Sequence, residues 1–227
     1  MKKYSTLLFD ADDTLLDFEK TARASIEKIF NKLGYGCSEE MQRRFQTIDR
    51  ELWKEHQENK ITMDTVLTVR FEKLFDTINI KVDGKEIQAI FNELLSQGSE
   101  LIDGALEVCK KLNEKYDLYV VSNGIQLTQD KRFKDSGLFC FMKEIFVSDM
   151  VGHHKPKKEF FEYVFNNIPN TDKSEMIIIG DSLLSDIKGA NNAGIDSCWF
   201  NPKRKQNDSN SIPTYEIQEL KELFNIL

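Results

Sequence analysis

The first apolar segment of the chain is short, and the segment after it has a different spacing. Residues 6–9 (Thr-Leu-Leu-Phe) form a continuous apolar run, which predicts a strand buried on both faces. From residue 17 to about residue 96, apolar residues recur every three or four positions, as on one face of a helix. Ser38 and Thr62 precede two of these stretches in the manner of N-caps, so we expect four amphipathic helices in succession. Their apolar positions are Phe18, Ala22, Ile29 and Leu33; Met41, Phe45, Ile48 and Leu52; Leu67, Phe71, Leu74 and Ile78; and Ile87, Ile90, Phe91, Leu94 and Leu95.

After Gly104 the pattern changes again, to helices that alternate with strands. Alternation of this kind is typical of βαβ units, in which the strands run parallel. A polar loop over residues 203–211 leads to a last apolar segment at 214–217 and a short C-terminal helix. The expected helices cover residues 105–115, about 128–136, 158–167 and 185–193, and the expected strands cover 118–121, 144–147, 176–179 and 197–200.

The two patterns divide the chain into two predicted domains. Residues 1–16 and 97–227 are expected to form an α/β core with a Rossmann-like parallel sheet. Residues 17–96 are expected to form a four-helix domain inserted after the first strand. Parallel sheets bind ligands at the carboxyl ends of their strands, so the residues that directly follow each strand are the candidates for chemistry.

Composition and charge restrict the partners and the compartment. The 227 residues include 31 Lys and Arg against 38 Asp and Glu, which gives a net charge of −7. The sequence has no basic stripe that could bind the phosphate backbone of a nucleic acid. We therefore expect neither a nucleic acid polymer nor a membrane surface as partner. No run of about 18 apolar residues and no signal-like start is present, which favours a cytoplasmic protein. The four cysteines are far apart and are expected to be reduced and buried.

Polar side chains follow four of the predicted strands. Each group alone has a structural explanation, because acids and Asn favour turns and helix N-termini and lysine clusters are usually solvated. Convergence at one sheet edge is harder to explain by stability, because it gathers carboxylates, a hydroxyl and an ammonium group. The residues are Asp10 and Asp12 after the first strand, Ser122 and Asn123 after the second, Lys155 in the loop after the third, and Asp181 and Asp186 after the fourth.

The order and spacing of these residues resemble the haloacid dehalogenase (HAD) superfamily over nearly the whole chain. Residues 10–14 (Asp-Ala-Asp-Asp-Thr) look like its first motif, Asp-x-Asp-x-Thr. Ser122 and Lys155 resemble the second-motif hydroxyl and the third-motif lysine. Asp181, with Asp186 five residues later, resembles the acidic fourth motif. The helical insert is similar to the first-type cap of this superfamily.

A second, narrower resemblance lies near the C-terminus. Residues 183–202 and 213–217 look like the branch that contains bacterial pyrimidine 5′-nucleotidases. His154 departs from the pattern, which has a smaller residue before the Lys-Pro pair. The resemblance implies a phosphatase that acts on small phosphate esters, with nucleoside 5′-monophosphates first among them, and a monomer or weak homodimer.

The resemblance also implies a mechanism that depends on Mg²⁺. A divalent cation offsets the repulsion between a phosphate ester and an anionic nucleophile, and Mg²⁺ prefers oxygen ligands. The implied ligands are the Asp10 and Asp181 side chains and the backbone carbonyl of Asp12. Asp10 attacks phosphorus to give an aspartyl-phosphate. Asp12, two residues further along an extended segment, lies on the same side and acts as general acid and then general base.

The remaining site residues are assigned around the phosphoryl group. Ser122, Asn123 and Lys155 are expected to hold its oxygens, the lysine as a charge and the hydroxyl as a donor. Thr14 and Asp186 are expected behind these groups, with Asp186 orienting the lysine or metal-bound water.

Single residues distinguish the phosphatase from three other activities of the superfamily. Dehalogenases lack a second acid such as Asp12, phosphomutases commonly have Gly-Val in place of Asp13 and Thr14, and phosphonatases add a lysine from the cap. A phosphatase fits best, and sugar phosphates, other small metabolites and a non-catalytic phosphate-binding regulator remain open. Aromatic residues of the insert are either core or a stacking surface for a base: Phe45, Trp53 and Phe71.

Overall fold

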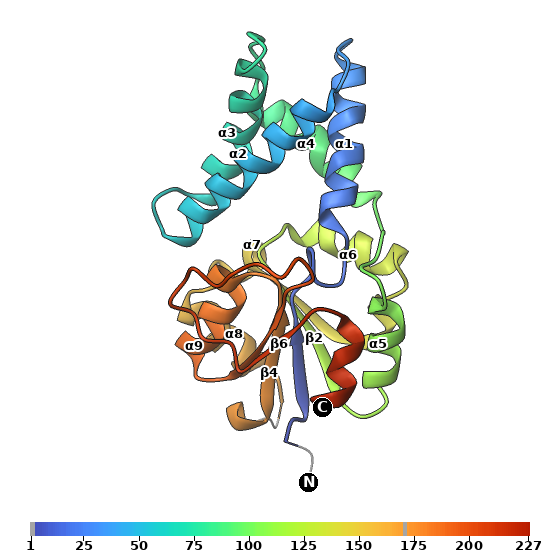
Figure 1. Ribbon diagram of the computed structural model, residues 1–227, viewed down its shortest axis with the longest axis vertical. Coiled ribbons are helices and arrows are strands. Elements are labelled where there is room, and N and C mark those ends of the chain that lie inside the picture. Colours follow the sequence, from blue (N-terminus) through green and yellow to red (C-terminus); the bar gives the residue numbers. More distant parts are fainter. Residues whose placement is uncertain (1–2, 170–171) are drawn as a thin grey trace. The chain divides into compact units, whose positions relative to one another are not determined.

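A six-stranded parallel sheet organises the part of the chain outside the helical insert (Figure 1). The structure is a computed structural model that describes residues 3–169 and 172–227. The strand order is β3-β2-β1-β4-β5-β6, the order of a doubly wound Rossmann fold. The predicted fold class is therefore confirmed. The strands are β1 (Thr6–Phe9), β2 (Asp117–Ser122), β3 (Met142–Val147), β4 (Met176–Gly180), β5 (Asp196–Phe200) and β6 (Tyr215–Ile217).

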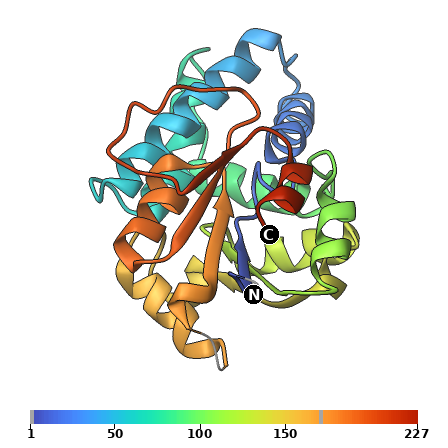
Figure 2. The ribbon, with the colours of Figure 1, turned by 60° about the horizontal axis from the view of Figure 1, so that its bottom comes forward.

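Helices cover both faces of this sheet, which explains why the first strand has no polar alternation (Figure 2). Leu7 and Phe9 point into one apolar cluster, and Leu8 points into the other. Helices α5 and α6 and the C-terminal 3₁₀ helix contribute to the first cluster, and α8 and α9 to the second. The helix bounds are α5 (Ala105–Leu112), α6 (Gln126–Asp135), α7 (Ser148–Val151), α8 (Lys158–Asn167), α9 (Lys188–Ala193) and the 3₁₀ helix Leu220–Asn225.

The register of the central strands brings three loops to one edge. Phe9, the last residue of β1, lies between Val120 of β2 and Ile179 of β4. Strands β2 and β3 are added on one side of β1, and β4, β5 and β6 are added on the other side. The boundary between β1 and β4 is therefore the switch point, where doubly wound sheets bind ligands. The residues that follow, from Asp10 onward and from Gly180 onward, therefore start side by side.

The chain leaves and re-enters the sheet domain through a short paired stem. Leu16 and Leu101 form an antiparallel bridge, and the Asp17 N–H donates to the Glu100 carbonyl at 2.9 Å. The chain divides into two compact units, Met1–Phe18 with Ser99–Leu227, and Glu19–Gly98. Each observed boundary falls two residues later than the predicted one. The assignment of the units as catalytic core and cap stays a prediction.

The helical unit has the four helices that the spacing predicts, and three of them begin at a capping side chain. The side chains of Ser38 and Thr62 accept from the backbone N–H groups three residues later, and Asp83 accepts from two N–H groups of the next turn. These caps satisfy donors that a helix leaves free at its start. The helices are α1 (Phe18–Lys32), α2 (Glu39–Gln57), α3 (Met63–Asp76) and α4 (Gly84–Ser96).

An arginine lies inside the helical unit. The Arg70 guanidinium is 4.8 Å from the centre of the Phe91 ring and donates to Asp49 at 2.6 Å. Phe45 and Phe71 are buried around it, so the structure assigns both to the core and not to a stacking surface; Trp53 is half-buried.

Several sequence expectations were wrong in detail. Strand β3 begins at Met142 and not at residue 144, and helix α6 begins at Gln126 and not near 128. The helix expected over 185–193 is a π-helical turn, Leu183–Ile187, followed by α9. Leu33, expected on an apolar face, is 38% exposed because it follows the end of α1. The four cysteines are free thiols, but Cys140 is exposed and Cys37 half-buried, and Cys109 and Cys198 alone are buried as predicted.

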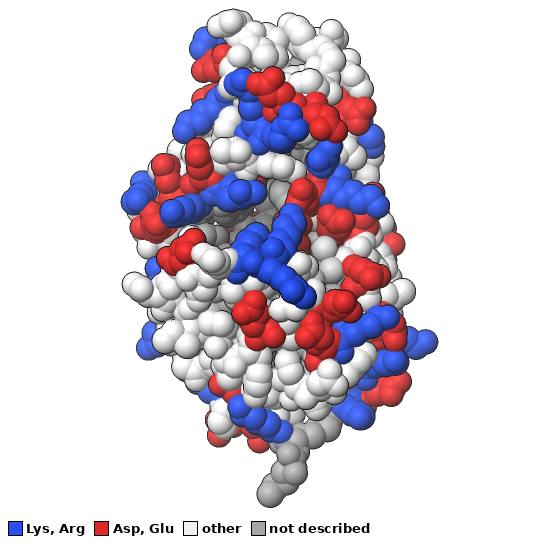
Figure 3. All heavy atoms as spheres, viewed as in Figure 1, with Lys and Arg blue, Asp and Glu red and all other residues white. Residues whose placement is uncertain are grey.

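The surface carries charges of both signs. On the face drawn in Figure 3, basic side chains lie in short patches among acidic ones, with no continuous basic track. Within the described residues, no helix combines the length and the apolar character needed to cross a bilayer.

Candidate active site

A tight turn after β1 places two of the predicted residues against each other. The Leu15 and Leu16 N–H groups both donate to the Ala11 carbonyl, and Asp13 adopts a φ of 60°. Asp is among the side chains that tolerate this left-handed region best. The turn folds Thr14 back on the strand end, where its hydroxyl donates to Asp10 Oδ2 at 3.1 Å.

The same threonine ties this turn to the loop after β4. The backbone N–H of Asp181 donates to the Thr14 hydroxyl oxygen at 3.1 Å. Thr14 is completely buried, so the bond is shielded from water. Thr14 thus fixes the Asp10 carboxylate relative to Asp181.

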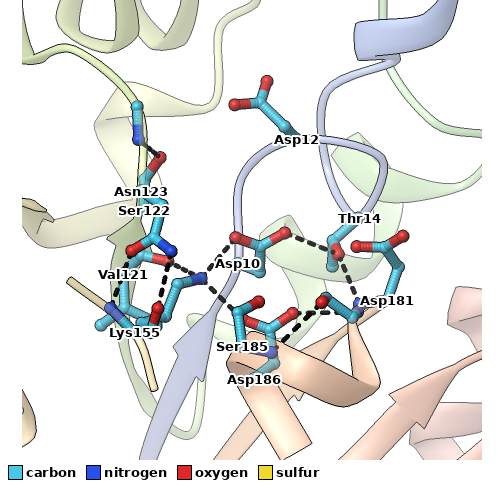
Figure 4. Close-up of polar contacts among 12 residues, drawn as sticks. Asp10, Asp12, Thr14, Val121, Ser122, Asn123, Lys155, Asp181, Ser185 and Asp186 are labelled. Carbon is cyan, nitrogen blue, oxygen red and sulfur yellow. Dashed lines mark hydrogen bonds and ion pairs between the residues drawn. The ribbon is translucent and has the colours of Figure 1, made fainter. Parts of the chain in front are cut away.

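Lys155 lies beneath the Asp10 carboxylate with its ammonium group fully engaged (Figure 4). Its Nζ donates to Asp10 Oδ1 at 2.6 Å, to Asp186 Oδ1 at 2.6 Å and to the Val121 carbonyl at 2.7 Å. An ammonium group has three donors, and all three are used. The lysine is 1% exposed. Burial opposes its charge, but the two carboxylates outweigh this and raise the pKa of Lys155, so the ammonium form persists.

Asn123 lies next to the lysine and is bonded to its backbone. Its Nδ2 donates to the Lys155 carbonyl at 2.9 Å, and its Oδ1 accepts from the Lys155 N–H at 2.8 Å. Both ends of the side chain are therefore used to hold the loop that carries the lysine. Binding of phosphoryl oxygens by Asn123 stays a prediction, since its Nδ2 has a second N–H besides the one donated to Lys155.

Glycine at the end of β4 makes room for Asp186. A Cβ on Gly180 would lie 2.3 Å from Asp186 Oδ2, a distance that no side chain could keep. That oxygen accepts from the Ser182 N–H at 3.1 Å, and the whole Asp186 side chain is buried. Asp186 thus lies behind Lys155, as expected of a residue that orients it.

Three carboxylates form a group of the kind that holds a metal ion. One oxygen each from Asp10, Asp181 and Asp186 lies within 4.8 Å of the others. Burial, and then the charge of Asp186, raise the pKa of Asp10 to about 7 despite the nearby lysine. Burial and the charges of Asp10 and Asp13 raise the pKa of Asp181 as well. A hard divalent cation fits this oxygen donor set and relieves the repulsion that it contains.

Asp12 lies outside that group. Its carboxylate points away from Asp10 (Figure 4), and its side chain is 31% exposed. It forms an ion pair with Arg132 and accepts from Gln129 Nε2 at 2.7 Å. Neither Gln129 nor Arg132 was predicted. The available signal was two polar residues one helical turn apart beside the apolar Phe133, which indicates a buried polar face.

The site places a carboxylate beside a buried ammonium group, with further carboxylates ready for a cation and a separate acid on the exposed side. Carboxylate groups of Asp and Glu are among the side chains that act as nucleophiles in covalent catalysis. The fold and the site together are those of an α/β protein with a ligand site at the switch point of a parallel sheet.

Comparison with known proteins identifies the family. The chain belongs to the haloacid dehalogenase-like hydrolases, whose family model matches residues 7–200, so the resemblance in the sequence is confirmed. It is 44% identical to the HAD-hydrolase YfnB of Bacillus subtilis, over 100% of this chain and 97% of that protein. The magnesium-bound crystal structure of YfnB, described as revealing interdomain movement, matches with a TM-score of 0.97 over 100% of this chain and 99% of that chain.

Two relatives are described as pyrimidine 5′-nucleotidases. PynA of Streptococcus pneumoniae is 32% identical over 99% of this chain and 95% of its own length. YjjG of Escherichia coli is 28% identical over 99% of this chain and 98% of its own length. The protein is thus a hydrolase of the haloacid dehalogenase-like family, with phosphatases among its relatives.

Proposed function

We propose that the protein is a Mg²⁺-dependent phosphomonoesterase that works through an aspartyl-phosphate and acts on pyrimidine nucleoside 5′-monophosphates. The observation that carries the proposal is that two aspartates of the same turn have different environments. Asp10 is buried against Lys155, and Asp12 lies on the exposed side, held by groups of its own. Of the two acids, Asp12 has the more exposed carboxylate and is therefore the one we assign to the leaving alcohol.

In the first half of the reaction Asp10 is the nucleophile. One of its carboxylate oxygens attacks phosphorus in line, the bond from phosphorus to the ester oxygen breaks, and the phosphoryl group becomes attached to Asp10. Asp12, in its protonated carboxylic acid form, gives its proton to the departing alkoxide and becomes a carboxylate. Mg²⁺, held by Asp10 and Asp181 with the Asp12 carbonyl, supplies charge that neutralises the phosphoryl oxygens.

In the second half Asp12 acts as a base. It takes a proton from a water molecule, which attacks phosphorus, releases phosphate and restores the Asp10 carboxylate. Ser122 and Lys155 hold phosphoryl oxygens through both steps, one through its hydroxyl and one through its charge. Asp186 keeps the lysine in place.

The choice of nucleotide substrates is supported by relatives and not by a contact. PynA and YjjG, both described as pyrimidine 5′-nucleotidases, match this chain over nearly their whole lengths. We propose the helical unit, Glu19–Gly98, as the cap that contributes contacts to the leaving group. The partner is then a small phosphate ester, and the expected compartment is the cytoplasm.

The test is phosphate release in Mg²⁺ from a panel of nucleoside 5′-monophosphates, sugar phosphates and phosphoglycolate. Turnover of UMP, dUMP or dTMP supports the proposal. Turnover of sugar phosphates alone keeps the mechanism and contradicts the substrate. Binding of phosphate and Mg²⁺ with no turnover of any ester contradicts the proposal that the protein is a phosphatase, and favours a phosphate-binding regulator.

Magnesium is expected to stabilise the protein more at pH 8 than at pH 6. Because the pKa of Asp10 is about 7 in the fold and 3.8 in its ordinary state, the folded protein binds this proton more tightly than the unfolded chain. The stability contributed by protonated Asp10 is present below pH 3.8 and is lost as pH rises to about 7. A cation replaces the lost proton, so the rise in Tm on adding MgCl₂ in place of EDTA should be larger at pH 8. An equal rise at both pH values, or an undiminished rise in Asp181→Asn, would contradict this assignment.

A further inference from the structure

Two polar residues of helix α6 are buried where the proposed mechanism has no task for them. Gln129 is 1% exposed and Arg132 is 0% exposed, and they lie one turn apart on the same face of the helix. Burial of a charged side chain is unfavourable unless the charge is paired. Their partners therefore indicate why they are there.

Both residues hold the carboxylate of Asp12. Arg132 Nη1 forms an ion pair with Asp12 Oδ1, and Gln129 Nε2 donates to Asp12 Oδ2 at 2.7 Å. The two residues are also joined to each other, because Arg132 Nη1 donates to Gln129 Oε1 at 3.2 Å. Each carboxylate oxygen thus has its own donor, so the plane and the direction of the carboxylate are fixed.

Gln129 also reaches the proposed phosphate-binding hydroxyl. Its Nε2 donates to Ser122 Oγ at 2.9 Å, and the Gly124 N–H donates to the same oxygen at 3.0 Å. A hydroxyl has two acceptor sites and one donor, so both acceptor sites of Ser122 are filled. Its own proton must point elsewhere, and Ser122 is left as a hydrogen-bond donor.

We propose that Gln129 and Arg132 are positioning residues, which aim the Asp12 carboxylate at the leaving-group oxygen and fix Ser122 as a donor to the phosphoryl group. The inference rests on the phosphomonoesterase function proposed above. A buried ion pair retained only for stability has little advantage over apolar residues of the same volume. A carboxylate that transfers a proton, in contrast, loses rate steeply when it is displaced.

The test uses two esters of similar shape whose leaving groups differ in basicity. Phenolate needs a proton as it departs, whereas p-nitrophenolate is a much weaker base and leaves without one. The ratio kcat/KM reports the steps up to phosphoryl transfer, so it separates the acid role of Asp12 from its later role as a base. We expect Arg132→Met and Gln129→Leu to lower kcat/KM about 10- to 100-fold for phenyl phosphate and at most about threefold for p-nitrophenyl phosphate.

Matched variants separate positioning from general damage. Gln126→Leu removes a glutamine one turn earlier on α6, where its Nε2 donates to Asp130, and should leave the ratio of the two kcat/KM values unchanged. Arg70→Met breaks a buried ion pair inside the helical unit and should also leave it unchanged. Arg132→Lys keeps a charge and should recover part of the phenyl phosphate rate, and it serves as the test if Arg132→Met does not fold.

The expected result has a further signature in the double variant. In an Asp12→Asn background, Arg132→Met should cause no additional selective loss for phenyl phosphate, because both changes act through one group. Equal losses for the two esters, or independent losses in the double variant, would overturn the positioning role while the phosphatase stands. Absence of phosphate release from either ester by the unaltered protein would instead overturn the proposed function, and this inference with it.

Discussion

Replacing Asp10 with asparagine is expected to abolish phosphate release, with a loss of about 10⁴-fold or more in kcat. Asparagine has nearly the same size, and its single amide oxygen can still accept from Lys155, but its amide cannot form an aspartyl-phosphate. The measurement is phosphate release under single-turnover conditions, together with trapping of the labelled intermediate. The unaltered protein should carry label after an acid quench, and the variant should carry none.

Stability provides the control for this loss. Ionised Asp10 is unfavourable in the fold, because its pKa there is about 7, well above 3.8. At pH 8 without metal, the neutral asparagine should therefore unfold at the same temperature as the unaltered protein or higher. A variant that is inactive and less stable under these conditions would show only that the site had collapsed. Residual turnover near the original rate would exclude Asp10 as the nucleophile.

Lys155→Met is expected to damage both activity and stability. The lysine is the shared counter-charge of Asp10 and Asp186, and its removal leaves two buried carboxylates facing each other. Removal of one member of a buried ion pair usually lowers stability by about 3–5 kcal/mol. Loss of a charge that holds the phosphoryl group should lower kcat by about 10²- to 10³-fold.

The destabilisation should grow with pH, because it arises from carboxylate charge. Lys155 lowers the pKa of Asp10, so the variant should raise that pKa further and lose more stability at pH 8 than at pH 5. Urea unfolding at both pH values measures this. Lys158→Met, which removes an exposed lysine paired with Glu162, is the matched control and should change stability by about 0.5 kcal/mol or less. Adding Asp186→Asn to Lys155→Met should restore part of the loss; no restoration would contradict the shared-charge account.

The sequence predicted the location of the site because the argument needed only the ends of strands. The apolar run before Asp10 and the run before Asp181 indicate buried parallel strands, and parallel strands end at one edge. The structure brings Asp10, Lys155, Asp181 and Asp186 together there. No knowledge of side-chain direction was required.

Side-chain direction is what the sequence left undetermined. Asn123 follows a strand just as Ser122 does, yet its amide is used by the Lys155 backbone. Arg132 lies 120 positions from Asp12, and the helical period identifies only a buried face and not the partner on it. Pairings between distant segments depend on the packed structure, in which a polar group finds whichever partner the fold presents.

The paired stem has a consequence for how such a protein can change over evolutionary time. The backbone of Asp17 and Glu100 is joined by a hydrogen bond, so the sheet domain is closed there whatever the chain does between them. The entropy of closing a loop grows slowly with its length, by about 0.6 kcal/mol per doubling. The stem is therefore a position at which inserts of different length can be exchanged, from a few residues to a whole folded unit. The strand ends that carry the carboxylates keep their register when the segment between Asp17 and Glu100 changes.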